Sequence, residues 1–561
     1  MSRYTLAVTC VAAALSGVAL AQAPPTQDPP APQGTASIAG RVVAGDTGRP
    51  AAGAMVMLGS RESIRVSRTT KTDAQGGFEF AGLVAGSYSL SAIHKRYLQT
   101  FYGQTPSLDR WSTIVLRDGE RFGRADIQLS KPGAIEGHVL DEFGDPAPDI
   151  LVKAYRTEFA AGARRLIVVG GPQADPTDDK GQFRFFGLAP GTYHLCAQSG
   201  AFVDEDVNNT GGFAPTFFPG TAEVSKSRGL TVTLGSARTG VTIRLVPART
   251  GRVAGTIVHG GGAVLQRGVV RLALHDPSGM SPIVATANVG RDGTFAFRNV
   301  PAGAYSLQAV GWTASGSEVL ASFGHHSFTA TGEDVERLTV AIKPGVTATG
   351  RVEFDGDDVP LPRPDEVVVT AQPLPSDSSI NVSSGGWLAK VREDWTFEIR
   401  DLTGWRIVQP LLFRLPAWVL SRVTLDGVDV TDTPLDFTRE DVSGLEILLT
   451  TRAGAVRGTV VSSTGEPVRD YAVVVFADDR ARWAYPSRFV ALARPDQEGR
   501  FEAKGLPPED YLVIAVPSVR GSEWLDPEFL EGLRADATRL LLTAGESRTV
   551  ELRLRAPART R

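Results

Sequence analysis

The chain has 561 residues, a formal net charge of −4, and 42% hydrophobic residues. It is too long for a single hydrophobic core, so several domains are expected. The weakly acidic balance supplies no basic surface for nucleic acid. The 60 glycines and 36 prolines are typical of many short strands joined by tight turns rather than of long helices.

The first residues have the pattern of a secretory signal peptide. Arg3 supplies the positive end, the apolar run from Leu6 to Leu20 follows, and Ala19 and Ala21 stand at the spacing that a signal peptidase reads. Cleavage is predicted after Ala21, with a second site at Ala23. The run is too short to span a bilayer as a helix. The mature chain is therefore expected to be secreted or periplasmic and not membrane-spanning.

A proline-rich segment, residues 22–34, follows the signal and is expected to be an extended spacer. Beyond the signal the chain keeps one cysteine, Cys196, so no intrachain disulfide can form. Cys196 lies in the strand-like sequence YHLCA. We interpret it as a small core residue rather than a nucleophile. The stability of the folded chain must then come from packing.

One sequence motif recurs along the whole mature chain. The stretch DDKGQFRFFGLAPGTYHL, which begins at Asp178, has clear counterparts near residues 72, 290 and 495 and a divergent one near 391. A step of roughly 100 residues is longer than a solenoid repeat and matches a tandem array of whole domains. The first aromatic residues of the five copies are Phe78, Phe183, Phe295, Phe397 and Phe501.

Each position of this repeat has a physical role. Asp178 can bond its own backbone two residues on, and Gly181 can adopt positive φ, so together they predict a tight turn. Phe183 and Phe185 alternate at period two and should share one face of a strand. Tyr193 begins the next strand and is expected to bury its ring while its hydroxyl stays at the rim.

A second motif precedes each repeat. It is a strand that carries a glycine and then turns, often at Gly-x-Pro such as Gly144 to Pro146, before an apolar strand such as YAVVVF from Tyr471. The glycines in register are Gly40, Gly137, Gly255, Gly350 and Gly458.

A third motif closes the unit. In Ser112 to Leu129 two alternating apolar stretches flank Asp118-Gly119, which predicts a hairpin. Similar stretches run from Leu230 to Leu245 and from Thr538 to Leu554. Their strict alternation indicates antiparallel strands with one face buried.

About seven strands per unit, with turn signals every 8–12 residues, predict an all-β fold of about five tandem seven-stranded Greek-key β-sandwiches. One short helix is expected after an N-cap at Asp526-Pro527, with Phe529, Leu530 and Leu533 on one face. The expected boundaries are unit 1 (35–130), unit 2 (131–248), unit 3 (249–345), unit 4 (346–452) and unit 5 (453–561).

These motifs together resemble the carboxypeptidase regulatory-like domain. The resemblance covers nearly all of the mature chain and implies a transthyretin-like (prealbumin-like) sandwich, close to Ig-like and carbohydrate-binding-like folds. Unit 4 departs most from the pattern, because its turn lacks the Asp and Gly and Ile407 stands in the place of the tyrosine. In metallocarboxypeptidases this domain does no chemistry, so the resemblance specifies the fold better than the function.

No catalytic constellation accompanies the repeats, and the chain is predicted not to be an enzyme. None of the seven histidines begins a His-x-x-Glu motif, and the adjacent pair His325-His326 would point to opposite faces of a strand. The repeated aspartates lack EF-hand spacing, and turns explain them. No cofactor or metal is expected.

The expected function is that of an exported, non-catalytic binding or scaffold protein of the cell envelope. Its partners would be a polysaccharide or another envelope protein, without nucleic acid. The first alternative is a carbohydrate-binding protein, in which loop aromatics stack on sugar rings; the candidates are Trp387, Trp483 and Tyr485, although the same rings could simply cover the edges of the sandwiches. A hydrolase accessory protein is a more distant alternative.

Overall fold

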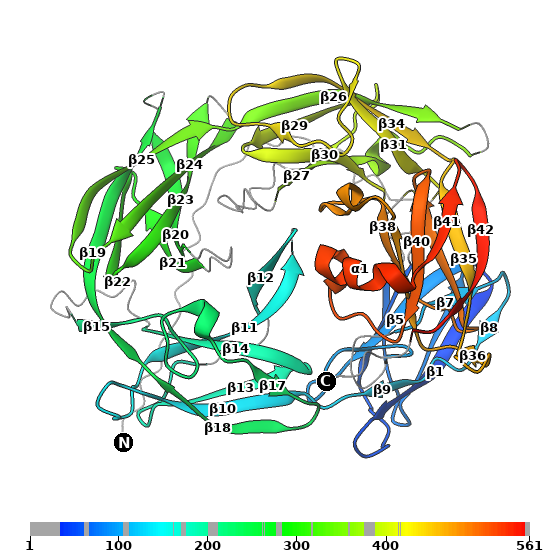
Figure 1. The fold of residues 1–561 in the computed structure, drawn as a ribbon, viewed down its shortest axis with the longest axis horizontal. Coiled ribbons are helices and arrows are strands. Elements are labelled where there is room, and N and C mark those ends of the chain that lie inside the picture. The colour runs from blue at the N-terminus through cyan, green and yellow to red at the C-terminus, as the bar shows by residue number, and fades with distance from the viewer. Residues whose placement is uncertain are drawn as a thin grey trace, which may run out of the picture.

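The computed structural model confirms the predicted array of β-sandwiches (Figure 1). It describes residues 34–60, 67–104, 111–160, 162–169, 175–199, 211–260, 262, 264–275, 283–315, 318–356, 359–374, 388–412, 415 and 417–555. The predicted signal peptide lies outside the described residues, as does the spacer up to residue 33. The unit boundaries given above remain predictions.

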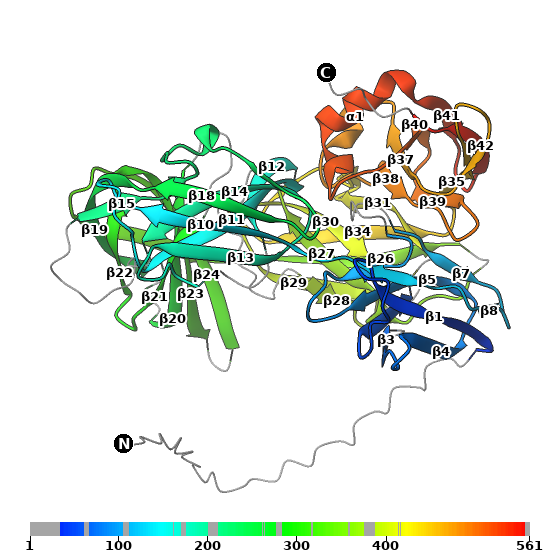
Figure 2. The same ribbon diagram turned by 90° about the horizontal axis from the view of Figure 1, so that it is seen from below.

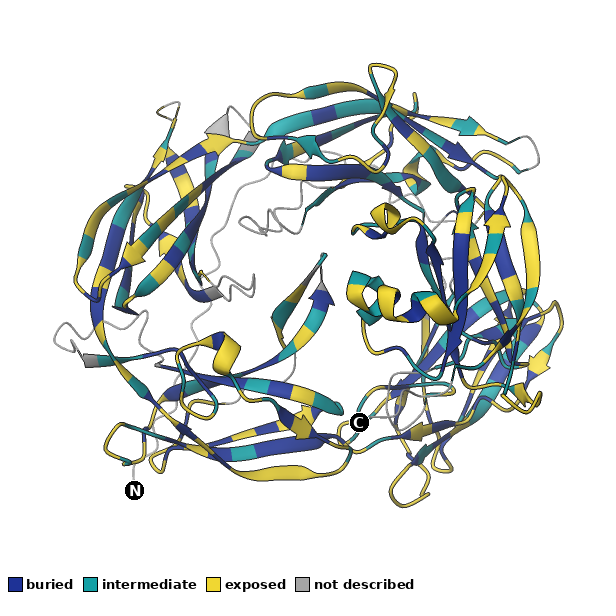
Figure 3. Cartoon of the chain, in the orientation of Figure 1, coloured by how far each residue is buried: buried dark blue, intermediate teal, exposed yellow. Residues whose placement is uncertain are grey.

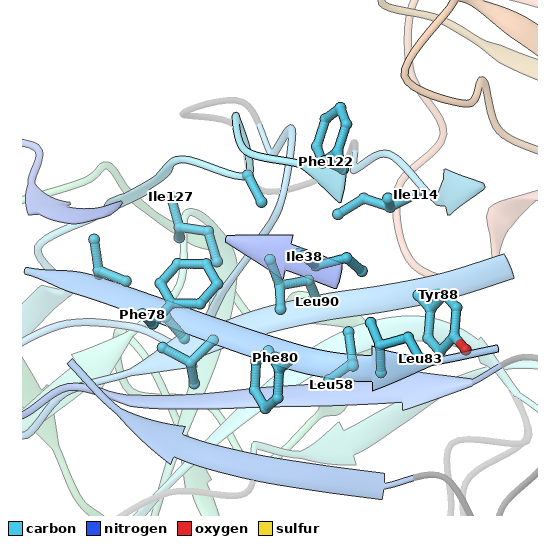
Figure 4. Packing of buried hydrophobic residues seen from close by; sticks show 14 of the residues in the cluster. Ile38, Leu58, Phe78, Phe80, Leu83, Tyr88, Leu90, Ile114, Phe122 and Ile127 are labelled. Carbon is cyan, nitrogen blue, oxygen red and sulfur yellow. The ribbon is translucent and has the colours of Figure 1, made fainter. Parts of the chain in front are cut away.

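Within the described residues, the hydrophobic cores of the five units follow one another along the chain. Their buried residues lie within 36–129, 135–245, 253–342, 348–449 and 456–552. Figure 3 shows the same pattern as buried positions alternating with exposed ones along most strands. In unit 1 the core lies between two sheets, with Phe78 and Phe80 of one sheet facing Leu58 and Leu90 of the other (Figure 4). This is the packing of a two-sheet sandwich.

The first sheet of each unit is built around its first strand, which carries one of the five glycines in register. This strand runs parallel to the last strand of its own unit. The first strands are β1 (Ala36–Ala44), β10 (Gly133–Leu140), β19 (Val246–His259), β26 (Val346–Asp355) and β35 (Gly454–Val461). The last strands are β9 (Ile127–Leu129), β18 (Ala237–Arg244), β25 (Val335–Pro344), β34 (Val442–Thr450) and β42 (Ser547–Arg553).

The repeated aromatic strand pairs antiparallel with the other edge of this first strand. In all five units the glycine of the first strand stands opposite the first aromatic residue, as in the pairs Gly137 with Phe183 and Gly458 with Phe501. The aromatic strands are β4 (Gly77–Leu83), β13 (Gln182–Leu188), β22 (Thr294–Pro301), β29 (Thr396–Leu402) and β39 (Arg500–Leu506).

The second sheet has the apolar strand at its centre, antiparallel to both neighbours. The central strands are β2 (Met55–Ser60), β11 (Ile150–Ala160), β20 (Leu265–Leu274), β27 (Val368–Pro373) and β37 (Ala472–Ala477). Outside them lie β3 (Ser67–Lys71), β12 (Ala163–Val168), β21 (Ile283–Val289), β28 (Leu388–Lys390) and β38 (Val490–Ala493). The tyrosine strands are β5 (Gly86–Ile93), β14 (Gly191–Ser199), β23 (Gly303–Ser315), β30 (Trp405–Leu411) and β40 (Glu509–Val516).

The prediction of a hairpin at the end of the unit is wrong for units 1, 2 and 5. In unit 1 its first arm, β7 (Ile114–Leu116), pairs with β5 in the second sheet, and its second arm, β9, pairs with β1 in the first. β17 (Leu230–Val232) in unit 2 and β41 (Thr538–Leu542) in unit 5 repeat this crossing. Alternation and a turn signal are the same whether the two arms pair with each other or arch between sheets, so sequence alone cannot separate these cases.

Further strands complete the sheets. They are β6 (Thr100–Phe101), β8 (Arg121–Phe122), β15 (Gly211–Ala214), β16 (Thr216–Phe217), β24 (Glu318–Ala330), β31 (Val419–Leu425), β32 (Val428–Asp429), β33 (Leu435–Asp436) and β36 (Pro467–Val468). Units 2 and 3 share a sheet, because β15 of unit 2 pairs with β19.

The repeated turn has the predicted chemistry. Oδ1 of Asp178 accepts hydrogen bonds from the backbone N–H groups of Lys180 and Gln182, and Gly181 has φ of 66°. In unit 4, Trp395 takes the left-handed position with φ of 65°, and its ring packs edge-on against Phe354 at 4.6 Å between centroids. Packing of the indole offsets the strain, so this divergent copy keeps the fold.

The repeated tyrosine fixes the turn before it. In units 1, 2 and 5 the ring is buried and the hydroxyl donates to the carbonyl four residues upstream: Tyr88 to Val84, Tyr193 to Ala189, and Tyr511 to Pro507. The ring thus belongs to the core while the hydroxyl ties the preceding turn to it.

Tyr511→Phe is expected to lower the free energy of unfolding of unit 5 by about 1 kcal/mol, because one hydrogen bond is lost while the buried ring remains. Hydrogen exchange of peptides from β40 and β41, compared with that of unit 1, measures the loss. A change equal in both units would show that the effect is not local to this turn.

The five units are arranged as one turn of a spiral. Figure 1 shows units 2, 3 and 4 following each other around an open ring, and Figure 2 shows unit 5, orange to red, stacked on unit 1, blue. Unit 5 also contacts unit 2, to which it is joined by Arg164 and Asp526, 362 residues apart in sequence. Unit 5 therefore closes the turn of the spiral by contacting units 1 and 2.

Candidate functional site: the groove between units 2 and 5

A groove lies where the spiral closes. It encloses about 1000 Å³ between units 2 and 5, with Trp111 of unit 1 at one edge. Cavities of this size at domain interfaces are common places for ligands in proteins. One wall is the hairpin β11–β12 and the start of β14, and the other is the helical segment of unit 5. Figure 1 shows this hairpin reaching into the ring toward α1.

The helical wall of unit 5 follows from its sequence. α1 (Pro527–Leu533) begins with a proline, and Oδ1 of the predicted N-cap Asp526 accepts from the N–H of Glu528 at 2.9 Å. Leu530 and Leu533 are buried, and Phe529 packs against the same cluster. The short helices η5 (Arg480–Trp483), η6 (Glu523–Leu525) and η7 (Arg534–Asp536) flank α1.

These helices cover the outer face of the second sheet of unit 5. Strand β37 is buried at all six positions, because it faces the sandwich core on one side and the helical layer on the other. This explains why its sequence is continuously apolar instead of alternating.

Trp483 belongs to this layer and does not project from a loop, as carbohydrate stacking would require. Its side chain is 2% exposed, its Nε1 donates to the carbonyl of Ala477 at 2.7 Å, and its ring packs edge-on against Phe476. An indole with this environment is a core residue. The sequence around it, RARWAYPSR, suggested exposure because its neighbours are polar.

Tyr485 is partly buried, close to the junction with unit 4. Nearby Arg488 pairs with Asp432 and donates to the carbonyls of Leu420 and Ser421. The segment thus joins units 4 and 5, and a role of Tyr485 in ligand binding stays a prediction. Trp387 lies outside the described residues.

The polar side chains of the groove are held by neighbours. Arg164 Nε is 2.7 Å from Oδ2 of Asp526, and its Nη2 is 2.9 Å from Oε2 of Glu528. The Arg156 guanidinium lies 5.6 Å from the centre of the Tyr193 ring. These contacts fix the guanidinium groups, and the unit 2 wall also exposes the hydroxyl-bearing residues Thr157, Thr192 and Thr231.

His194 and Cys196 are among the titratable groups of unit 2 whose pKa is shifted by burial. Burial lowers the pKa of the His194 imidazole, whose Nδ1 lies 2.8 Å from the Ser227 hydroxyl. Burial also raises the pKa of the Cys196 thiol to about 12. Cys196 is thus a neutral core residue, as predicted, and is inert as a nucleophile at neutral pH.

The contact of unit 5 with unit 1 borders the groove. The side-chain amide of Gln497 bonds both backbone groups of Val115, accepting from its N–H at 2.9 Å and donating to its carbonyl at 2.7 Å. The Arg494 guanidinium lies 3.7 Å from the centre of the Trp111 ring. Gln497 directly follows the aspartate of the repeated turn, so unit 5 uses its turn as a docking element.

Sequence reasoning missed the groove because its walls come from separate units. The signals that exist are local: the helix after Asp526, and the unusual length of the strand that begins at Ile150. Neither predicts that the two meet. Within the described part of the chain, no three His, Cys, Asp or Glu side chains gather closely enough to hold a metal ion. No helix among those residues has the length and apolarity to cross a membrane.

Comparisons with known proteins place the first unit in a family. Residues 37–130 match the model of the carboxypeptidase regulatory-like domain, which confirms for unit 1 the resemblance carried by its motifs. No curated protein matches the chain.

The solved structures to which the chain is similar at low identity include two pilins and part of a collagen-binding protein. A streptococcal ancillary pilin is 12% identical, with 55% of this chain and 99% of that chain covered and a TM-score of 0.17. GBS52, the minor pilin of Streptococcus agalactiae, is 14% identical over 38% and 98%, with a TM-score of 0.24. Two B repeat units of the collagen-binding protein of Staphylococcus aureus are 13% identical over 74% and 99%, with a TM-score of 0.13. TM-scores this low carry no argument about function.

Proposed function

We propose that this chain is an exported, non-catalytic binding and scaffold protein of the cell envelope, built from carboxypeptidase regulatory-like modules. The observation that carries the proposal is the groove of about 1000 Å³ formed where unit 5 closes the spiral on unit 2. The groove forms only when units 2 and 5 are brought together by the other modules. A binding role of the groove therefore explains why the chain keeps its modules in this order. Export rests on the predicted signal peptide.

The chemistry of the groove supports binding rather than catalysis. Its Arg164 is engaged by two carboxylates, Asp526 also caps a helix, and His194 is held by Ser227. These side chains have structural partners and are not poised as an acid, base or nucleophile around an open position. Assays with peptide and ester substrates are expected to show no turnover; turnover that survives a chelator would contradict this part of the proposal.

Blocking the groove tests the binding function. Thr192 is exposed in the groove, and Thr549 is also exposed, on β42, outside the lining of the groove. The full chain is incubated with a solubilised envelope fraction, and captured material is compared for wild type, Thr192→Trp and Thr549→Trp. We expect capture to be lost in Thr192→Trp alone, because the indole fills the groove. Equal capture by all three would reject the groove as the binding surface.

A carbohydrate ligand is the second candidate. The hydroxyl groups of Thr157, Thr192 and Thr231, together with both signs of charge at Arg156 and Glu158, suit the many weak hydrogen bonds of an uncharged sugar chain. Periodate oxidation of the envelope fraction destroys sugar diols, and protease treatment removes protein partners. Loss of capture after periodate alone supports a polysaccharide, and loss after protease alone supports an envelope protein.

A further inference from the structure

The hairpin β11–β12 is longer than the sandwich of unit 2 needs. β11 has 11 residues, whereas the equivalent strands β2, β27 and β37 have six each. β20 has 10, but it pairs with β23 from its first residue to its last. Only its first half, Ile150 to Tyr155, pairs with β14 inside the sheet. From Arg156 to Ala160 its one strand partner is β12, so this half overhangs the unit.

The overhang ends on unit 5. The Ser522 hydroxyl donates to the carbonyl of Phe159, and Arg164 of β12 pairs with Asp526 and Glu528. The Phe159 side chain is only 8% exposed although it lies outside the core cluster of its own unit. The hairpin therefore places a backbone carbonyl and a charged side chain in a contact between units far apart in sequence.

The ion pairs between the hairpin β11–β12 and unit 5 contribute little free energy. The Arg164 side chain is 54% exposed and that of Glu528 74%, whereas that of Asp526 is only 9% exposed. Exposed ion pairs contribute about 0–1 kcal/mol and are screened by salt. Unit 5 also closes on unit 1, through two neutral hydrogen bonds of Gln497 with Val115 at about 1 kcal/mol each and through the Arg494–Trp111 contact. Small polar interfaces between domains permit relative motion.

We propose that the hairpin β11–β12 is a latch, which holds unit 5 against unit 2 and opens when the Arg164 ion pairs are broken. Because the groove has one wall on each side of this contact, opening the latch takes the groove apart. If the groove binds a ligand, occupancy and closure must favour each other by linkage. That consequence depends on the proposed function, whereas the latch itself does not.

Charge reversal at Arg164 tests the latch in the full chain. Arg164→Glu places a third acid beside Asp526 and Glu528, and the matched control Arg184→Glu breaks the Arg184–Glu136 ion pair inside unit 2. We expect Arg164→Glu alone to increase the radius of gyration in X-ray scattering and to speed hydrogen exchange at residues 156–160 and 522–526. Circular dichroism and slow exchange in β14 verify that unit 2 stays folded. Scattering and exchange equal to those of the control would overturn the proposal.

A zero-length crosslink tests closure without disrupting it. In Arg164→Lys, a carbodiimide can join the lysine amine to Asp526 or Glu528 only while the carboxylate is in contact. We expect the linked peptides at low salt and a several-fold lower yield in about 1 M sodium chloride, where the Debye length is about 3 Å. No crosslink at low salt, or a yield independent of salt, would contradict a latch held by charge.

Discussion

Trp483→Ala is expected to destabilise unit 5 by about 3–5 kcal/mol, the range found when buried aromatic residues are truncated. The indole is 2% exposed between β37 and the helical layer, and its N–H is bonded to the carbonyl of Ala477. Truncation leaves a cavity and an unpaired carbonyl, and both costs fall on the layer that forms one wall of the groove. Hydrogen exchange resolved by unit, followed with increasing denaturant, measures the loss.

Tyr485→Ala is the matched control, because Tyr485 lies two residues away and is only partly buried. It should cost much less. The same pair of variants separates packing from sugar binding. If Trp483→Ala left unit 5 as stable as wild type and abolished capture of an envelope polysaccharide, the indole would be a ligand-binding residue and not a core residue.

The fold could be predicted from sequence because each of its determinants is local. The bond from Asp178 to its own turn, the alternation of Phe183 and Phe185, and the tyrosine that follows are all encoded within about 20 residues. Their repetition multiplies the signal, so that even unit 4, with Trp395 at the turn, is recognised. Local periodicity is the strongest information that a single sequence carries.

The candidate site could not be predicted in the same way, since it depends on contacts between units. RARWAYPSR appears exposed by composition, but the helical layer from a segment about 40 residues later covers Trp483. The partners of Arg164 and Gln497 are 362 and 382 residues away. The same limit explains the wrong hairpin: whether β7 and β9 pair with each other or with opposite sheets is decided by strands elsewhere in the unit.

Gly458→Ala is expected to destabilise unit 5 by about 1–3 kcal/mol through overpacking. A β carbon at this position would overlap the carbonyl of Val550 and come within 3.1 Å of the Phe501 ring. The glycines in register in the other units are also blocked by a carbonyl close to or in the last strand: Ala125, Val241, Leu338 and Leu445. The glycine is therefore required because the first and last strands run parallel at close approach, and backbone cannot move aside as a flexible side chain can.

Gly532→Ala is the control for that substitution. Gly532 lies inside α1 with no atom near its missing β carbon, so alanine there should be neutral or stabilise the helix by up to about 1 kcal/mol. Hydrogen exchange of β35 and β42 measures both variants. Opposite effects of Gly458→Ala and Gly532→Ala would show that the cost at Gly458 comes from the close approach of the strands and not from alanine in general. If both variants were neutral, parallel pairing would tolerate a side chain, and the glycine that marks every unit would need another explanation.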